Sequence, residues 1–193
     1  NQALSIGAIA GGCRYYAGYP ITPASDILEF MAAHLPAFGG LALQTEDEMA
    51  ALASALGASF GGVSAMTATS GPGLSLMVEL IGLGVMSELP VVIVDVQRAG
   101  PSTGMPTKTE QGDLNLAVYG GHGDAPRIVV APVSVADCLE VGRQAFRLAG
   151  RYQTPVVVLS ELVLAQRTES LPMPRGARLV LQPEWGGPGS DGR

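Results

Sequence analysis

Three runs of almost unbroken apolar residues set the strongest limit on how this chain can fold. They are 91-VVIVDV-96, 127-RIVVAP-132 and 155-PVVVLS-160, and none alternates between apolar and polar positions. Runs of this kind are typical of strands that are covered on both faces, as in a parallel sheet. The sequence therefore predicts a layer of buried strands with helices packed against it.

Weaker strand candidates and helical stretches alternate with these runs. Strands are also expected at 14–19, 41–45 and 64–69, with helices over 23–35, 47–60, 74–86 and 135–148. This alternation predicts a doubly wound α/β domain, with a mostly parallel sheet of about six strands and helices on both faces. We expect the domain to occupy residues 1–165. The proline- and glycine-rich residues 166–193 are expected to be a linker or tail leading to a further domain.

Composition argues against several classes of function. The formal net charge is −6 and Lys108 is the single lysine, so nucleic acid is not an expected partner. Cys13 and Cys138 lie far apart, which favours a reducing, cytoplasmic setting and no disulfide framework. His34 and His122 have no second ligand at metal-binding spacing, so no metal site is expected on this chain. The apolar runs are too short for a membrane span, so no membrane contact is expected.

Four unusual segments are expected to meet at one edge of the sheet. They are 19-YPITPAS-25, 45-TEDE-48, 69-TSGPG-73 and 97-QRAGPSTGMPTK-108, and each follows a predicted strand. Ligands of open parallel sheets bind outside the carboxyl ends of the strands. A binding site is therefore expected where these four segments converge.

The acidic TEDE segment has two interpretations. Thr45 followed by Glu48 fits a capping box, and acids suit the first turn of a helix. Alternatively, Glu48 shares a helical face with Ala51 and Ala55, a small-residue surface on which a flat group could pack. Gly57 would then lie on the opposite side, toward the sheet. A carboxyl group in such a dry place would have a raised pKa and could share a proton near neutrality.

The other segments also have an ordinary and a functional interpretation. Gly71 and Gly73 come before a helix, where free N–H groups could bind an anion or simply turn the chain. Arg98 ends a predicted strand and could bind a carboxylate, or form a salt bridge with Asp95. Thr22 could donate its hydroxyl to the same anion, or cap the helix that follows it.

Together these segments resemble a known family. The strings 18-GYPITPASD-26, 44-QTEDEMAA-51, 66-MTATSGPGLSLM-77 and 94-VDVQRAGPSTGMPTKTEQGDL-114 are similar to the α subunit of 2-oxoacid:ferredoxin oxidoreductases. The resemblance is to its pyrimidine-binding (PYR) thiamine diphosphate domain and extends over about the first 165 residues. The last string looks like the 2-oxoglutarate type. One departure is Ala24, where the family usually has serine.

The resemblance implies an activity that one chain shares with a partner. A 2-oxoacid, expected to be 2-oxoglutarate, would be oxidatively decarboxylated to an acyl-CoA and CO2, with electrons passing to ferredoxin. Thiamine diphosphate is the implied cofactor and coenzyme A the co-substrate. The GDG…Asn motif for diphosphate and magnesium is absent from the sequence, as is cysteine spacing for a [4Fe–4S] cluster. A β subunit is therefore expected to carry the diphosphate site, Mg²⁺ and the cluster in an α/β hetero-oligomer.

The resemblance also implies roles for single residues. The family pattern E-x-x-A-x-x-x-A-x-G assigns the glutamate that activates the aminopyrimidine to Glu48, with Glu46 as the runner-up. Thr22 and Arg98 match residues that hold the substrate carboxylate. Lys108 is expected to reach a second substrate carboxylate or a coenzyme A phosphate. Further contacts to the cofactor are expected from Pro20, Thr69, Ser70 and Gly71.

Other functions remain open on the sequence alone. The chain could be the PYR domain of a decarboxylase or a transketolase-like thiamine enzyme, although these normally lack the PITP and QRAGPSTG strings. It could be a catalytically silent interaction subunit, which the joint presence of Thr22, Glu48 and Arg98 disfavours. A phosphate-binding α/β protein using 71-GPG-73 is the third possibility, and no other motif supports it.

Overall fold

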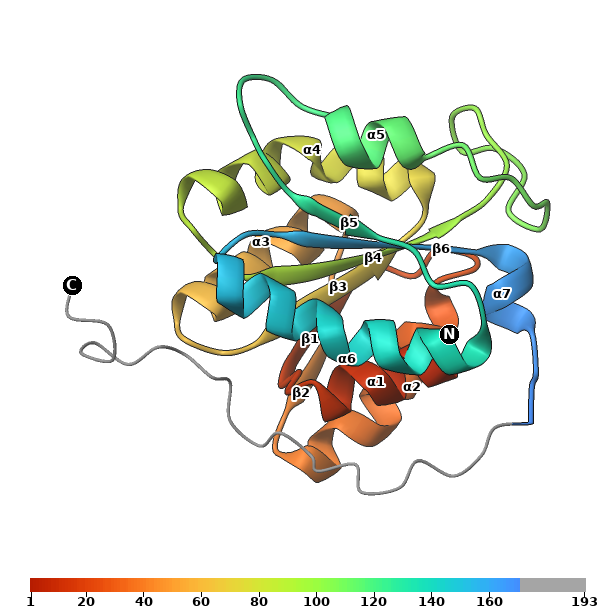
Figure 1. Ribbon diagram of the computed structural model, residues 1–193, viewed down its shortest axis with the longest axis horizontal. Helices are drawn as coiled ribbons and strands as arrows, with labels where there is room; N and C mark the ends of the chain where they lie inside the picture. Colours follow the sequence, from red (N-terminus) through yellow and green to blue (C-terminus); the bar gives the residue numbers. More distant parts are fainter. Residues whose placement is uncertain (171–193) are drawn as a thin grey trace.

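The computed structural model describes residues 1–170, and a six-stranded parallel sheet forms their centre (Figure 1). The strand order is β2-β1-β3-β4-β6-β5. The strands are β1 (Tyr15–Gly18), β2 (Leu41–Gln44), β3 (Ala65–Thr69), β4 (Val91–Gln97), β5 (Ile128–Val130) and β6 (Val156–Glu161). The predicted parallel sheet is confirmed, and all six strands overlap the predicted ranges.

Helices cover both faces of the sheet, so the predicted doubly wound α/β fold is confirmed (Figure 1). One face packs against α1 (Gln2–Ala10), α2 (Ser25–His34) and α6 (Val135–Tyr152). The other packs against α3 (Glu48–Phe60), α4 (Gly71–Met86) and α5 (Leu114–Tyr119). A short α7 (Leu162–Gln166) continues directly from β6, and a 3₁₀ turn (Leu35–Phe38) follows α2.

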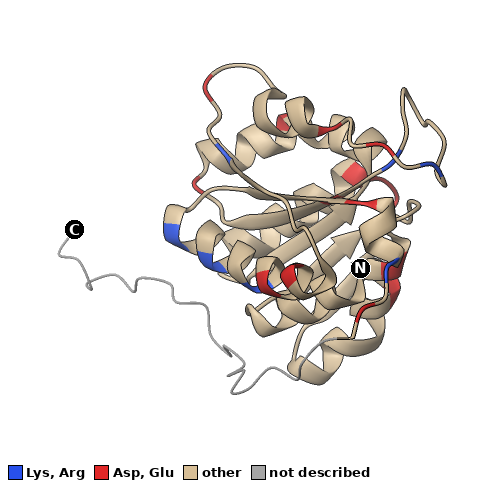
Figure 2. Ribbon diagram, turned by 45° about the vertical axis from the view of Figure 1, so that its right-hand side comes forward, with Lys and Arg blue, Asp and Glu red and all other residues tan. Residues whose placement is uncertain are grey.

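The strand order contains a topological switch point between β1 and β3. From β1 the chain moves outward to β2, and it then returns to form β3 on the other side of β1. The helices that follow β1 and β3, α2 and α4, therefore lie on opposite faces of the sheet, and ligands of such sheets bind at the carboxyl edge beside this point. Figure 2 marks acidic and basic positions of the ribbon near this edge, while further basic positions follow α6 toward the opposite end.

Strand β4 is buried along its whole length. All seven of its side chains are buried, including the polar Asp95 and Gln97. Because Ile93 belongs to the core beneath α3, α4 and α5, the alternation of the strand places Asp95 and Gln97 on that same face. In the parallel register Asp95 lies beside Thr69 of β3.

The edge strand β2 has the opposite character. It pairs only with β1, and Leu41 and Leu43 are 56% and 41% exposed. The strand is held mainly by its ladder with β1 and by Ala42, which packs into the core beneath α1, α2 and α6. It leads directly into the turn that begins α3.

Some helices and helix boundaries differ from those predicted. Helices α1, α5 and α7 were not predicted, and α4 begins at Gly71 rather than at residue 74. The earlier start is possible because Ser70 is the N-cap and Pro72 stands in the first turn, where a missing N–H costs nothing. The expected domain boundary after residue 165 falls inside α7, and residues 171–193 of the expected tail lie outside the described residues.

Candidate functional site

The segments that follow β1, β2, β3 and β4 meet at the carboxyl edge beside the switch point. They carry Thr22, Glu48, Ser70 and Arg98, four of the residues singled out in the sequence. Parallel strands all end at the same edge, which is why Thr22 and Arg98 are hydrogen-bonded although they are 76 residues apart.

Glu48 is the first residue of α3, but it is not part of a capping box. The N-cap is Asp47, whose Oδ1 accepts a hydrogen bond of 2.7 Å from the Ala50 N–H. The Thr45 N–H, which a capping box would pair with Glu48, is bonded to the Gly18 carbonyl at 3.0 Å. The predicted capping box is therefore wrong, and the task of capping falls to the neighbouring acid.

The surroundings of Glu48 separate it from Glu46. Glu48 is 7% exposed, whereas Glu46 is exposed. A Cβ placed on Gly73 would lie 2.6 Å from Glu48 Cγ and 2.0 Å from Thr69 Oγ1. The glutamate thus packs on the first turn of α4, in space that only a glycine leaves open. The sequence suggested for Gly73 only a turn or an anion-binding role shared with Gly71, and its contact with Glu48 was not predicted.

The inner face of α3 is not a free surface. Ala51 and Ala55, which share a face with Glu48, are fully buried in the core, and Gly57 is exposed with no atom near its Cβ position. The expectation that Gly57 faces the sheet is wrong, because the buried side of the helix is the one that begins with Glu48. The Glu48 side chain therefore lies where the core of the domain reaches the carboxyl edge.

Arg98 lies at the end of β4 and is held by main-chain carbonyls. Its Nη1 donates to the Thr22 carbonyl and its Nη2 to the Thr103 carbonyl, both at 2.6 Å. The alternative of a salt bridge to Asp95 is wrong, since the ion pairs within the described residues are Arg143–Glu140 and Arg167–Glu169. Arg98 is only 8% exposed, and its Nε lacks a hydrogen-bond partner within residues 1–170.

The charge of Arg98 is incompletely compensated. Burial lowers the pKa of the Arg98 guanidinium, and the negative charge of Glu48 acts in the opposite direction. Glu48 is near enough to affect this charge, yet the two side chains form no ion pair. An arginine that is buried and has no bonded acid is suited to an anionic ligand such as a carboxylate.

Thr22 contributes to the site by its backbone as well as its side chain. Its carbonyl accepts the hydrogen bond from Arg98, and its side chain is exposed. It does not cap the next helix, because α2 begins at Ser25 with Ala24 at the N-cap. The two residues proposed to hold a substrate carboxylate therefore lie next to each other.

Thr69 and Ser70 are fully buried where β3 gives way to α4. The Thr69 hydroxyl donates to the Ser70 carbonyl at 3.3 Å, whereas the Ser70 hydroxyl has no partner in the described part of the chain. Buried hydroxyl groups are normally hydrogen-bonded, so Ser70 is a candidate to bind a ligand. Gly71 begins α4, and a Cβ there would lie 2.7 Å from both carboxylate oxygens of Asp113.

Two of the residues expected to bind the cofactor or substrate lie on the surface of the domain. Pro20 and Lys108 are exposed, and Lys108 is fixed through its backbone, which bonds to Ala99 and Met105. The structure therefore does not bring the Lys108 side chain into contact with Glu48 or Arg98.

A pair of acids, one fully buried and one half-buried, lies behind this edge and was not predicted as a pair. Asp95 is fully buried, and its carboxyl group is within hydrogen-bonding reach of Asp113, which precedes α5. Burial raises the pKa of Asp95 well above its usual range, and the negative charge of Asp113 raises it further. Burial also raises the pKa of Asp113. The sequence signal was an aspartate inside an otherwise apolar strand.

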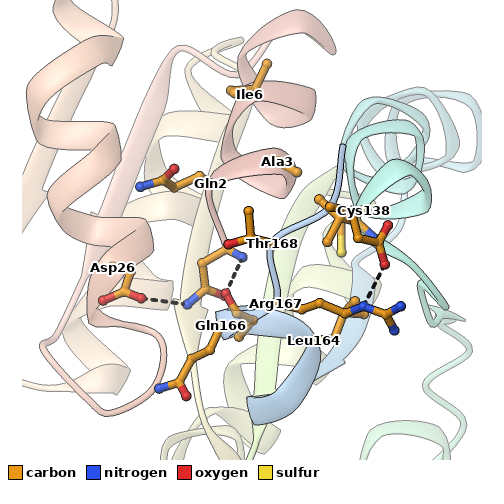
Figure 3. Close-up of a pocket in the computed structure, with 13 residues that line it drawn as sticks. Gln2, Ala3, Ile6, Asp26, Cys138, Leu164, Gln166, Arg167 and Thr168 are labelled. Atoms are coloured by element: carbon orange, nitrogen blue, oxygen red, sulfur yellow. Dashed lines mark hydrogen bonds and ion pairs between the residues drawn. The ribbon is translucent and has the colours of Figure 1, made fainter. Parts of the chain in front are cut away.

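Other hollows lie away from Glu48. One, of about 510 Å³, lies between α1, α2, α6 and α7, and Figure 3 shows Asp26, Cys138 and Gln166 on its wall. Another, of about 330 Å³, lies beside Gln97 and Glu161. Within residues 1–170, no cluster of histidine, cysteine or acidic side chains has the geometry to bind a metal ion. None of the helices in this range is long and apolar enough to cross a membrane.

Comparison with known proteins identifies the fold and the family. A chain of 2-oxoglutarate:ferredoxin oxidoreductase from Magnetococcus marinus, solved with 2-oxoglutarate, coenzyme A and succinyl-CoA bound, superposes with a TM-score of 0.84 and 53% identity. The match covers 85% of this chain and 29% of that one. The 2-oxoglutarate synthase subunit KorA of Archaeoglobus fulgidus is 52% identical over 174 residues, 90% of this chain and 50% of the relative.

A further relative gives the same result. The 2-oxoglutarate oxidoreductase subunit KorA of Mycobacterium tuberculosis is 50% identical over 90% of this chain and 27% of its own length. This chain thus spans half or less of the length of these relatives. The family model "pyruvate flavodoxin/ferredoxin oxidoreductase, thiamine diphosphate-binding" matches residues 6–184. This chain therefore belongs to the thiamine diphosphate-binding domain family of the pyruvate flavodoxin/ferredoxin oxidoreductases.

Proposed function

We propose that this chain provides the pyrimidine-binding half of the active site of a 2-oxoacid:ferredoxin oxidoreductase, and that the substrate is 2-oxoglutarate. The observation that carries the proposal is the position of Glu48, a buried carboxylate between the first turn of α4 and the charge of Arg98. The likeness to 2-oxoglutarate oxidoreductase subunits supports the choice of substrate. The assignment of residues 1–165 to this function, and of 166–193 to a connection, is part of the proposal.

The residues at the edge fit thiamine diphosphate. Glu48 would share a proton with N1′ of the aminopyrimidine and so promote its imino form. The Glu48 carboxyl group is buried and does not cap its own helix, so it is available for this contact. The unpartnered Ser70 hydroxyl and the close approach of α4 at Gly73 would hold the ring against α3. Thr69, Gly71 and Pro20 complete the proposed contacts. When bound, the cofactor supplies the carbon nucleophile that attacks the 2-oxo group and accepts the electrons left by CO2.

Arg98 and Thr22 would bind the 2-oxoacid carboxylate. The guanidinium is already oriented by two carbonyl groups, and its remaining N–H groups have the fork geometry that a carboxylate prefers. The exposed Thr22 hydroxyl would donate to the same group. Lys108, which is exposed in the loop after β4, would reach the distal carboxylate of 2-oxoglutarate or a phosphate of coenzyme A.

The rest of the active site is proposed to come from a partner. We assign the diphosphate contacts, Mg²⁺ and a [4Fe–4S] cluster to a β subunit in an α/β hetero-oligomer, with ferredoxin as electron acceptor and coenzyme A as co-substrate. The relatives' designation as oxidoreductase subunits supports an assembly of this kind. The cytoplasmic location stays a prediction.

The test is a dye-reduction assay on the full-length chain assembled with its partner. 2-Oxoglutarate, pyruvate and a branched 2-oxoacid are supplied in turn with coenzyme A. Glu48→Gln should lower kcat about 100-fold or more, the size of effect that follows loss of an acid–base group. Glu46→Gln is the matched control and should keep the wild-type rate. The reverse result would assign the chemistry to Glu46. Turnover of none of the three acids, with thiamine diphosphate bound, would refute the proposed function.

A further inference from the structure

Asp95 is fully buried and Asp113 is half-buried, and no basic side chain of the described residues forms an ion pair with either of them. Both oxygens of Asp95 and Oδ2 of Asp113 lack a hydrogen-bond partner within residues 1–170. The two ion pairs of this region lie elsewhere. Two facing carboxylates have four acceptor oxygens and no donor. A single shared proton supplies the missing donor and removes the charge of the fully buried Asp95 or of its half-buried neighbour.

The fold offers some compensation for the charge that remains. Asp113 lies against Gly71, the first residue of the 16-residue helix α4, so its carboxylate faces the positive end of that helix. Any side chain at Gly71 would occupy the space of this carboxylate. The pair therefore suits a state with one proton and one negative charge.

The pair lies at the end of the loop formed by residues 99–113, which begins next to Arg98. The Asp113 N–H donates to Gln97 Oε1 at 3.0 Å, and Gln97 Nε2 donates to the Ser160 carbonyl of β6 at 3.1 Å. Nearer its start, the loop offers the Thr103 carbonyl to Arg98. If the end of the loop comes free, the Thr103 carbonyl, which orients Arg98, is therefore affected as well.

We propose that Asp95 and Asp113 share one proton, that this bond fastens the 99–113 loop to β4, and that it thereby positions the guanidinium of Arg98. Loss of the proton would leave two carboxylates in contact and would release the loop. Asp95 and Asp113 are thus positioning residues. The shared proton and the fastening of the loop follow from geometry, whereas the effect on substrate rests on the proposed function.

Neighbouring ionisable groups do not replace this proton. Glu110, in the same loop, has the same sign as Asp113 and accepts a hydrogen bond from the Gly100 N–H. Glu161 of β6, in register with Gln97, bonds two N–H groups of α7. Glu48 at the start of α3 acts electrostatically on Arg98, which follows β4. The first turn of α4 carries no ionisable side chain, and neither does Leu114 at the start of α5.

Infrared spectroscopy tests the shared proton directly. The full-length chain, assembled with its partner, should show the C=O band of a protonated carboxyl group at neutral pH, with a shift in D2O. Asp95→Asn should lose this band, and Asp124→Asn, which changes an exposed acid, should keep it. Absence of the band from the wild type, or its survival in Asp95→Asn, would overturn the proposal.

Hydrogen exchange tests the fastening of the loop. Asp95→Ala removes both donor and acceptor and should speed exchange of the Ala99, Met105 and Lys108 amides roughly tenfold or more, as expected for losing a bond to a charged group. Asp95→Asn keeps a donor for the Asp113 carboxylate and should exchange like the wild type. The wild-type loop should also loosen at the pH where the infrared band disappears, after correction for intrinsic exchange, and Asp95→Asn should not. Equal loop protection in all variants at every pH would overturn the proposal.

Kinetics then separate this proposal from the proposed function. KM for 2-oxoglutarate should rise about tenfold in Asp95→Ala and return to the wild-type value in Asp95→Asn. An unchanged KM together with a loosened loop would refute the positioning of Arg98 and leave the proposed function intact. Failure of the wild type to turn over any 2-oxoacid would refute the function, while the infrared and exchange results would still decide the shared proton and the loop.

Discussion

The guanidinium of Arg98 donates a 2.6 Å hydrogen bond to the main-chain carbonyl of Thr22 and so joins the ends of β4 and β1. Its second bond, to Thr103, joins the same side chain to the loop that follows β4. One side chain thus holds together three backbone segments of the edge. Its planar array of N–H groups allows this and leaves donors for a ligand.

Replacing Arg98 by lysine should therefore impair substrate binding more than cofactor binding. A lysine keeps the charge but cannot bond both carbonyls and a carboxylate in one plane. We expect Arg98→Lys to raise KM for 2-oxoglutarate about tenfold or more, while the Kd for thiamine diphosphate stays within about threefold. Arg151→Lys, at an exposed position on α6, is the control. Equal losses of substrate and cofactor affinity would show that Arg98 only holds the fold together.

Gly73 and Gly82 provide a matched pair on α4. Gly73→Ala would place a methyl group 2.0 Å from Thr69 Oγ1 and 2.6 Å from Glu48 Cγ, whereas a Cβ on Gly82 meets nothing within 4 Å. Gly73→Ala should therefore displace the glutamate, lower kcat by at least about tenfold and destabilise the domain by about 1–3 kcal/mol. Gly82→Ala should stabilise the helix by about 0.5–1 kcal/mol with normal activity. Kinetics and urea unfolding of both variants check the contrast, and normal activity in Gly73→Ala would contradict it.

Asp47→Ala separates capping from chemistry. Asp47 accepts the Ala50 N–H, so its removal should cost about 0.5–2 kcal/mol of stability. The rate of the assembled enzyme should fall by less than about threefold at a temperature where the variant is folded, because Glu48 is unchanged. Thermal unfolding and dye reduction give the two readouts. A loss of rate in Asp47→Ala as large as that in Glu48→Gln would contradict the assignment of capping to Asp47 and chemistry to Glu48.

Because of Asp95 and Asp113, the free energy of unfolding should fall as pH rises. The pKa of Asp95 is raised in the folded state, so the folded chain binds more protons than the unfolded chain above the ordinary aspartate pKa of about 3.9. Stability is then lost by up to about 1.4 kcal/mol per pH unit, until the folded pKa is passed. The raised pKa of Asp113 acts in the same direction. Asp95→Asn should flatten this slope in urea titrations between about pH 5 and pH 8. Parallel slopes in variant and wild type would contradict the prediction.

The sheet could be predicted because its signal is local. The runs around Val92, Val129 and Val157 are apolar at successive positions, a pattern typical of parallel strands that are covered on both faces. The strands around Val92 and Val157 are buried, whereas the edge strand around Val129 is half-buried. Helices α5 and α7 escaped prediction because they are one or two turns long and exist mainly through their packing. Helix α1 was missed because its residues are almost uniformly apolar or small and so lack a clear amphipathic period.

The site was only partly predictable, for a related reason. The pattern around Glu48 selected the glutamate that the structure buries, and Thr22 and Arg98 were expected together. The N-cap was misassigned because the Thr45 amide is bonded by Gly18, a partner that strand pairing brings in from another part of the chain. The acid pair is likewise tertiary, since nothing near Asp113 in the sequence indicates that Asp95 lies against it.

The two main residues of the site follow strands that differ in burial. Glu48 follows the one edge strand of the described sheet that carries two exposed leucines and has a single neighbour, whereas Arg98 follows the fully buried β4. Edge elements with few buried contacts open at lower free energy than central strands. Fluctuations of the domain will therefore first disturb the turn that presents the acid and leave the arginine in place. As the temperature rises, catalytic activity that depends on Glu48 should be lost before the affinity for the substrate that depends on Arg98.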